Sequence, residues 1–266
     1  MAPVHHKRFL SDSHFHSTAM RERGINPDEV LHTFRDEFDG PLLDVAIEPE
    51  DISRQRLLSG AVPNVYYSCG LHPSRTDRED WEPTMHTIER EISSGAFHAV
   101  GETGLDWYRM YASQERQREL FHRHLVLSRN TQLPIIVHNR EANEDVLDMI
   151  SHAHLSTPGV MHCFSSGPEW VKPFLDAGMY ISFAGNLTFK NASALREAIT
   201  LVPEERLLLE TDAPFLAPHP VRGQPNHPGL LRHTLTCAAE LRNTSPEHLG
   251  EQVARNLATL LNVPVT

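Results

Sequence analysis

Two histidines stand one residue apart near the start of the chain, in the stretch SDSHFHS (residues 11–17). The apolar pair Phe9-Leu10 precedes them, which is typical of a short strand that ends in polar residues. Side chains at positions i and i+2 of a strand point to the same face of the sheet. His14 and His16 therefore share either a solvated surface or a metal ion, and the stretch alone leaves both interpretations open.

Further nitrogen and oxygen donors end later apolar runs: His72, Glu102, Asp106, His138, Arg140, His162 and Asp212. Imidazole and carboxylate groups suit zinc, manganese or similar divalent ions. Their number exceeds one tetrahedral site, and two ions that share a bridging carboxylate would use them. The alternative for each histidine is a structural hydrogen bond. For Glu102 and Asp212 it is a buried ion pair, and Arg140 is the nearest candidate partner.

The elements that must position these groups alternate along the chain. Eight apolar segments are expected as strands within residues 8–16, 41–49, 65–73, 97–106, 133–140, 159–166, 179–186 and 206–215. Helices are expected over residues 27–38, 50–59, 81–94, 113–130, 141–153, 168–177, 191–201, 228–242 and 245–262. Eight strand–helix units predict a TIM (β/α)8 barrel, as a single hydrolase domain over residues 1–266, with its active site at the carboxyl ends of the strands. The alternative is an open doubly wound sheet, for which 266 residues leave little room.

The chain has a net charge of −11, from 24 Lys and Arg against 35 Asp and Glu. Such a field repels nucleic acid, so a phosphate substrate would need local cations at the site. The longest apolar runs are too short to cross a bilayer, and MAPVHHKRFL lacks the apolar core of a signal peptide. Three widely spaced cysteines, Cys69, Cys163 and Cys237, indicate no disulfide framework. We expect a monomeric, cytoplasmic protein without membrane contact.

The motifs as a set resemble the TatD family of metal-dependent hydrolases, which are amidohydrolase-like barrels. The matching stretches are DSHFH, GLHP, VGETGLDWY, PIIVHNREA, MHCFSS and LLLETDAPFLAP, and they span residues 9 to about 262. The chain departs from the family pattern in PNHP (residues 225–228), where a histidine stands in place of a common glutamate. The resemblance implies a divalent-metal centre and a nuclease that acts on DNA phosphodiesters.

The resemblance also implies two groups of ligands that share Glu102 as a bridge. The first ion would be held by His14, His16, Glu102 and Asp212, and the second by Glu102, His138 and His162. The ions would be Zn, Mn or Mg. His72 and Arg140 are similar to residues that contact the substrate phosphate. Trp107 and Tyr108 could stack on a base, and ordinary packing is their alternative.

The expected chemistry is attack by a metal-activated water, with Asp212 as the base and Glu102 as the bridging catalytic carboxylate. The first hypothesis is a metal-dependent phosphodiesterase or deoxyribonuclease that attacks nucleic-acid ends. The second is an ester or amide hydrolase, such as an aminoacyl-tRNA deacylase, that uses the same metal centre. The third is a non-catalytic barrel, against which the complete ligand set argues. A carboxylated-lysine bridge of the phosphotriesterase type is disfavoured because Glu102 occupies that position.

Overall fold

The computed structural model describes residues 8–58 and 62–265. Predictions that involve residues 1–7, 59–61 and 266 lie outside this part of the chain. They concern the N-terminal stretch without a signal-peptide core, the end of the helix expected over residues 50–59, and the outer limits of the expected domain.

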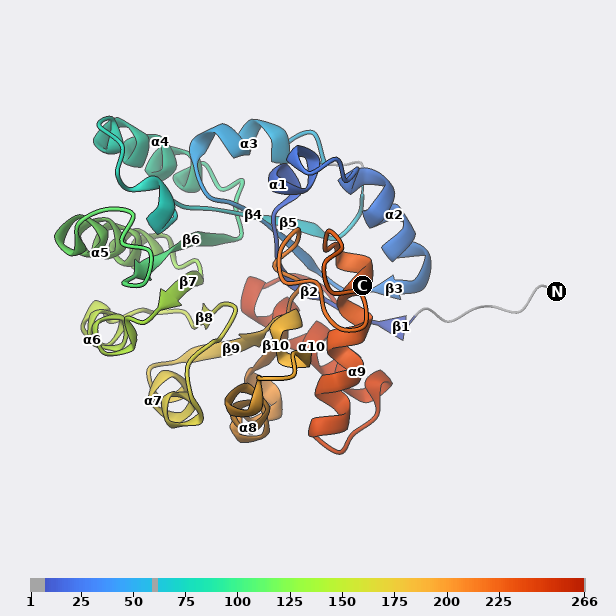
Figure 1. Ribbon diagram of the computed structural model, residues 1–266. Helices are drawn as coiled ribbons and strands as arrows, with labels where there is room; N and C mark the ends of the chain where they lie inside the picture. The colour runs from blue at the N-terminus through green and yellow to red at the C-terminus, as the bar shows by residue number, and fades with distance from the viewer. Residues whose placement is uncertain (1–7, 59–61, 266) are drawn as a thin grey trace.

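Eight parallel strands form one sheet, in the order β10-β9-β8-β7-β6-β5-β4-β2. They are β2 Asp12–Phe15, β4 Leu42–Ala46, β5 Val65–Cys69, β6 Ala99–Asp106, β7 Ile135–Arg140, β8 Gly159–Met161, β9 Met179–Phe183 and β10 Leu207–Leu209. Helices surround this sheet (Figure 1). The predicted TIM barrel is confirmed, because the sheet curls until its first and last strands meet.

The barrel closes where β2 meets the segment after β10. The backbone N–H of Asp212 donates to the carbonyl of His14 (2.9 Å), and the N–H of His16 donates to the carbonyl of Ala213 (2.8 Å). Asp12 reinforces the seam, because its carboxylate accepts from both the backbone N–H (2.9 Å) and the hydroxyl (2.6 Å) of Thr211. The seam therefore joins residues from the two ends of the barrel's sequence at its carboxyl edge.

The first expected strand, residues 8–16, is split. β1 Arg8–Phe9 pairs with β3 Phe38–Asp39 in a separate two-stranded sheet, and only β2 joins the barrel. The Leu10 N–H donates to the carbonyl of Asp39 (2.9 Å), which carries this pairing one residue further. Leu10 itself is buried in the main core.

Ten α-helices lie in the described part of the chain, and nine of them fall where the sequence predicts them. They are α1 Ser17–Glu22, α2 Pro27–Glu37, α3 Pro49–Gln55, α4 Trp81–Ser93, α5 Gln114–Thr131, α6 Asn143–Ala153, α7 Val171–Asp176, α8 Ser193–Leu201, α9 Leu231–Leu241 and α10 Pro246–Leu261. The short α1 was not predicted. The helix expected over 168–177 begins as a 3-10 turn at Pro168–Trp170, and the one expected over 228–242 begins as a 3-10 turn at Pro228–Leu230.

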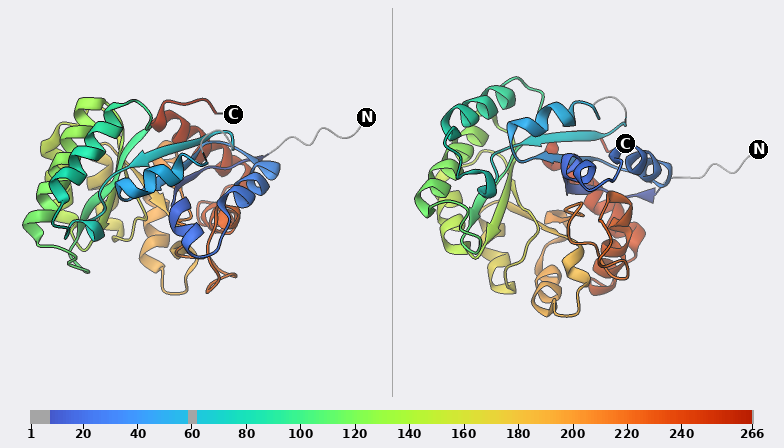
Figure 2. Two further views of the ribbon diagram at one scale, coloured as in Figure 1. Left: turned by 90° about the horizontal axis from the view of Figure 1, so that it is seen from above. Right: turned by 45° about the horizontal axis from the view of Figure 1, so that its top comes forward.

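Inward-pointing apolar side chains fill the amino end of the barrel. Ile136, Val160 and Leu208, from three strands, form a cluster with Leu257 and Leu260 of α10. Figure 2 (left) shows the red helix α10 at one end of the barrel and the orange loop after β10 at the other. Because side chains two residues apart share a face of a strand, the positions one step further along these strands point into the opposite end.

The outward faces of the strands pack against the helices. Phe15, Phe183 and Leu209 lie in the main core with Leu31 of α2 and Phe121 of α5. Phe15 therefore points away from the two histidines that flank it. All three cysteines are free, in line with the absence of a disulfide framework. Among the helices of residues 8–58 and 62–265, none is both long and apolar enough to cross a membrane.

Candidate metal centre

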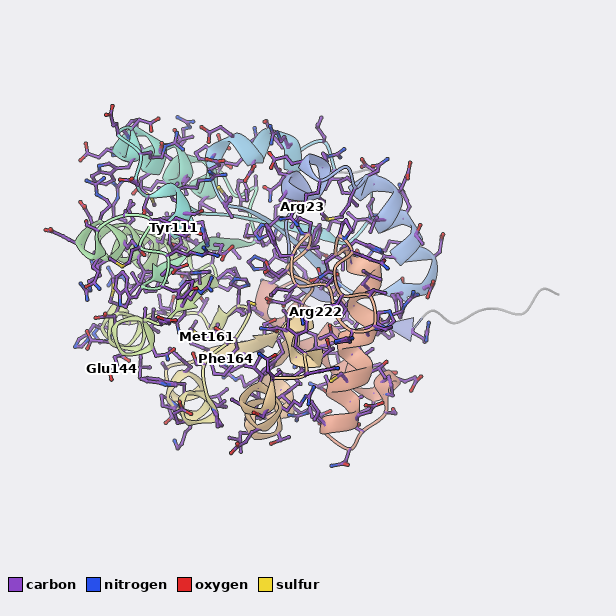
Figure 3. All side chains as sticks on the ribbon, in the orientation of Figure 1. Arg23, Tyr111, Glu144, Met161, Phe164 and Arg222 are labelled. Carbon is purple, nitrogen blue, oxygen red and sulfur yellow. The ribbon has the colours of Figure 1, made fainter. Side chains whose placement is uncertain are left out.

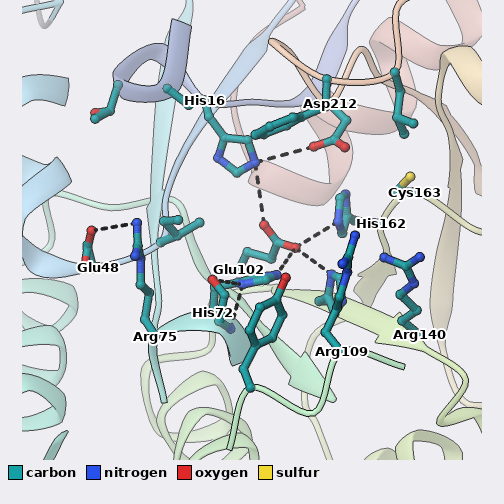
Figure 4. Close-up of a pocket in the computed structure, with 18 of the residues that line it drawn as sticks. His16, Glu48, His72, Arg75, Glu102, Arg109, Arg140, His162, Cys163 and Asp212 are labelled. Carbon is teal, nitrogen blue, oxygen red and sulfur yellow. Dashed lines mark hydrogen bonds and ion pairs between the residues drawn. The ribbon is translucent and has the colours of Figure 1, made fainter. Parts of the chain in front are cut away.

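Glu102 lies at the centre of the carboxyl end of the barrel, on the long strand β6, and is 3% exposed. Its two carboxylate oxygens face different groups of histidines (Figure 4). Oε2 lies 3.3 Å from Nε2 of His14 and 3.7 Å from Nε2 of His16. Oε1 lies near three ring nitrogens: 2.9 Å from His162 Nε2, 3.0 Å from His138 Nδ1 and 3.4 Å from His72 Nε2. A carboxylate so placed can bridge two ions.

His14, on β2, and His16, just after it, converge on one point. The Nε2 atoms of His14 and His16 are 3.1 Å apart, and Nε2 of His16 is also 3.5 Å from Oδ1 of Asp212. Nδ1 of His16 donates to the carbonyl of Val45 (2.9 Å), which leaves its Nε2 lone pair facing the site. Ring orientation fixed by a backbone carbonyl is a common arrangement for metal-ligating histidines.

The group on the other side of Glu102 comes from three units of the barrel, those of β5, β7 and β8. His138 follows the inward Ile136 on β7, and His162 follows the inward Val160 of β8. The pleat therefore lifts both imidazoles to the carboxyl end above the apolar layer. His72 follows β5 and caps the 3-10 turn Pro73–Arg75. Its Nδ1 accepts a hydrogen bond from the backbone N–H of Ser74 (3.0 Å).

Two carboxylates outside the predicted ligand set hold these rings in place. Oε1 of Glu210 faces Nδ1 of His162 (2.9 Å) and accepts from the backbone N–H of Cys163 (2.8 Å). Oδ2 of Asp106 lies 3.3 Å from Nε2 of His138. The sequence analysis assigned no role to Glu210. Its position in LLLETD, two residues after the inward Leu208 and two before Asp212, marks it as an inward carboxylate in an apolar run.

The charges of the centre depend on one another. Burial opposes ionisation of Glu102, but His162, His72 and His14 outweigh it and hold the pKa of Glu102 well below its usual value. Burial likewise opposes protonation of His162, yet Glu102 and Glu210 hold its pKa well above the usual value. A buried carboxylate among imidazoles therefore keeps its negative charge, as a metal-bridging ligand must.

The pKa values of His14 and His16 are shifted in opposite directions. Burial, aided by nearby His162, lowers the pKa of His14 to about 3. Burial also opposes protonation of His16, but Asp212 and Glu102 outweigh it and raise its pKa to about 9. Because ligating imidazoles must be neutral, a divalent ion that binds here would compete with the proton on His16.

The donor set fits divalent metal ions. Three groups of ligand atoms each lie within 4.8 Å of one another: His14-His16-Glu102, His72-Glu102-His138 and His14-His162-Glu210. Nδ1 of His14 is buried and has no hydrogen-bond partner among the residues that the structure describes. These are nitrogen and oxygen donors, which zinc and manganese favour. His72 thus lies with the candidate ligands as well as beside the space for a substrate.

A cavity of about 690 Å³ opens above this centre. Six predicted site residues besides Asp212 line it: His16, His72, Glu102, His138, Arg140 and His162. His14 is fully buried beneath it. Two residues that the sequence analysis missed, Arg109 and Tyr111, also line the cavity. They belong to the loop after β6, whose proximity to the site follows from the fold, although their side-chain directions do not follow from the sequence.

The two aromatic residues predicted to stack on a base, Trp107 and Tyr108, are not among the residues that line this cavity. The indole N–H of Trp107 donates to Asp145 (2.8 Å), and its ring packs against the main core. The Tyr108 ring is half-exposed and lies against arginine side chains. Contact of either ring with a substrate stays a prediction.

Comparison with known proteins agrees with this geometry. The model of the family described as TatD-related DNase matches residues 11–262. The chain is 36% identical over 259 residues to YcfH of Escherichia coli, an uncharacterized metal-dependent hydrolase, with 96% of each chain covered. It is 40% identical over 191 residues to TatD of Mycobacterium tuberculosis, also an uncharacterized metal-dependent hydrolase, with 70% of this chain and 72% of that one covered.

A solved structure shows the same architecture. YjjV, a TatD homologue from Escherichia coli, has a TM-score of 0.84 and 27% sequence identity, over 96% of this chain and 98% of that one. The match extends over the barrel and the segments that supply the candidate ligands. It supports the barrel fold described above.

Proposed function

The chain belongs to the family of TatD-related DNases and metal-dependent hydrolases, and from that premise we propose that it is a two-metal phosphodiesterase that hydrolyses nucleic acid at strand ends. The observation that carries the proposal is the position of Glu102, with one oxygen toward His14 and His16 and the other toward His72, His138 and His162. Two ions bound on either side of one carboxylate suit a phosphodiester, whose attacking and leaving oxygens both need stabilisation.

Divalent ions held here would supply an activated water and positive charge at the phosphate. The chain's own residues do the rest. Asp212, which lines the cavity and whose Oδ1 lies 3.5 Å from Nε2 of His16, would accept the proton of the attacking water. Glu210 and Asp106 hold His162 and His138 in fixed orientations, so that the ligands need little rearrangement on binding.

Local cations compensate for the net charge of −11. Arg109 and Arg140 both line the cavity. Guanidinium groups recognise phosphate oxygens with two parallel hydrogen bonds, which makes them suitable for a nucleic-acid strand. We extend the proposal to a cytoplasmic monomer formed from a single barrel domain.

The test is degradation of a 3′-labelled single-stranded DNA oligonucleotide with added magnesium, manganese or zinc. We expect cleavage that a chelator abolishes and that Glu102→Gln loses. Glu247→Gln, on the exposed start of α10 at the other end of the barrel, is the matched control and should cleave like the wild type. Bound metal should be measured in all three proteins.

Wild-type protein that holds metal but cleaves no phosphodiester would overturn the nuclease proposal. The same protein should then be assayed on ester and amide substrates, including aminoacyl-tRNA. The family assignment would stand in that case, since it depends on the fold and the sequence match.

A further inference from the structure

The wall of the cavity on the β6–β7 side carries two arginines that form no ion pair with any carboxylate in residues 8–58 and 62–265. They are Arg109, in the loop after β6, and Arg140, the last residue of β7, and both line the cavity. Their positive charge is therefore available to a ligand.

One aromatic ring fixes both side chains. The guanidinium carbon of Arg140 lies 4.1 Å from the ring centroid of Tyr108, and that of Arg109 lies 5.4 Å from it. A cation held over an aromatic ring is attracted by the ring and loses side-chain freedom in advance of binding. Tyr108 thus serves as a support for the two arginines.

The backbone brings this support to the metal centre. Asp106 of β6 lies opposite Arg140 of β7 in the sheet register, and the Trp107 N–H donates to the carbonyl of Arg140 (2.9 Å). Asp106 also accepts from the backbone N–H of Arg109 (2.7 Å), while its second oxygen faces His138 (3.3 Å). The same carboxylate therefore orients a candidate metal ligand and anchors the loop that carries Arg109.

The opposite wall has a different charge balance. Glu22, Glu48 and Asp51 line it, together with Arg75. Arg75 is paired with Glu48 (3.3 Å), and in Figure 4 this pair and the two arginines of the β6–β7 wall lie on opposite sides of Glu102. Figure 3 likewise shows Tyr111, from the loop after β6, and Arg23, from the turn after α1, at different sides of the barrel end. Glu22 is paired with Arg54 (3.0 Å), and Glu48 is also paired with Arg78 (3.5 Å), so this wall offers a polyanionic strand less free positive charge than the β6–β7 wall does.

We propose that Arg109 and Arg140, supported by Tyr108, form a binding site for a second phosphate of the strand, adjacent to the phosphodiester that is cleaved. The inference rests on the proposed phosphodiesterase function. The substrate class that follows is a nucleic-acid strand with at least two consecutive phosphodiesters. One would lie at the metal centre and the next on the β6–β7 wall with Arg109 and Arg140, which we call the arginine wall. A single isolated phosphodiester would use only half of the site.

The test uses trinucleotides, in which one of the two linkages is replaced by an uncharged methylphosphonate. The linkage that is cut is identified from the product. For the wild type, we expect neutralisation of the uncut linkage to raise KM about tenfold, which corresponds to the loss of one charge-assisted hydrogen-bonded contact. In Arg109→Gln and in Arg140→Gln, KM for the fully charged trinucleotide should rise, and the penalty for neutralisation should shrink toward onefold.

Arg255→Gln, on exposed α10 at the far end of the barrel, removes the same charge from the protein and should retain the full penalty. Tyr108→Leu should reduce the penalty partly, because both guanidinium groups lose their support. An equal KM for charged and neutralised trinucleotides in the wild type would overturn the second-phosphate site. So would an undiminished penalty in both arginine variants. A wild type that cuts neither trinucleotide would instead contradict the proposed function itself.

Discussion

The same strands build both ends of the barrel, but the side chains that point inward are apolar at one end and polar at the other. At the amino end, Ile136, Val160 and Leu208 point inward and pack against α10. One step along the same strand faces, His138, His162 and Glu210 point into the carboxyl end, where the two histidines contact Glu102 and Glu210 contacts His162. The pleat of each strand thus sets an apolar layer directly beneath a layer of ligands.

This difference separates the residues that stabilise the fold from the residues that can do chemistry. Apolar burial at the amino end contributes to the free energy of folding. At the carboxyl end, imidazoles and carboxylates are buried at a cost that only mutual pairing or metal binding offsets. Substitutions at the two ends should therefore separate activity from stability.

The largest effect is expected at the carboxyl end from Asp212→Asn. A general base contributes about 10²–10⁴-fold to the rate. Loss of the proposed base should therefore lower kcat on single-stranded DNA by about 10³-fold. Asp212 has a φ of 53°, a left-handed conformation that asparagine tolerates well, so the thermal unfolding midpoint should change little. A large drop in stability with unchanged kcat would contradict the expectation that substitutions at the carboxyl end affect activity more than stability.

The amino end should show the opposite pattern in Leu257→Ala. This fully buried side chain of α10 contacts the inner layer of the strands, and its truncation should cost about 3 kcal/mol of unfolding free energy through lost burial and a cavity. Denaturant titration measures the loss, and kcat of the folded fraction should remain that of the wild type. The control is Leu201→Ala on α8, where the side chain is 53% exposed and the cost should be small.

Glu210→Gln tests a residue of the carboxyl end that orients a candidate ligand. Removing the carboxylate that orients His162 should weaken metal affinity or activity by about 10- to 100-fold, as for other residues that orient a ligand. Metal titration by calorimetry gives the affinity. Glu205→Gln, on the exposed side of the same segment, is the matched control. Equal affinities in the two variants would show that Glu210 does not position the ligand.

The smallest effect concerns a buried histidine outside both layers. Nε2 of His124 on α5 accepts from the Leu71 N–H (3.0 Å), and burial lowers its pKa from 6.5 to about 4. Because the folded pKa is the lower one, the unfolded chain takes up this proton first, and stability falls as the pH drops below 6.5 toward 4. Between pH 6.5 and 5.5 the loss should approach about 1 kcal/mol. In His124→Gln the decline of unfolding free energy over this pH interval should be shallower by that amount, and an unchanged slope would contradict the assignment.

Much of the barrel could be predicted because its signals are local. The eight apolar segments predict all eight barrel strands, and the helices expected between and after them coincide with nine of the ten α-helices in the described part of the chain. The short α1 was missed because six residues leave no helical period to detect. β1 was merged with β2 because their separation depends on pairing with β3, a contact distant in sequence.

The candidate ligands could be found because each ends a strand, but their supports could not. Glu210 and Asp106 act through the rings they touch, and a sequence shows no such contact. The arginine wall depends on the register between β6 and β7, which brings Asp106 opposite Arg140. The sequence analysis therefore identified the chemical groups of the centre more completely than the groups that orient them.

The seam that closes the barrel has a consequence for the order in which the protein is made. His14 and His16 are synthesised nearly 200 residues before Asp212, whose N–H donates to the His14 carbonyl. Contacts of such large sequence separation form late in folding. The candidate metal centre of a nascent chain thus stays incomplete until Asp212 is synthesised, and hydrolytic competence arises only when the barrel closes at this seam.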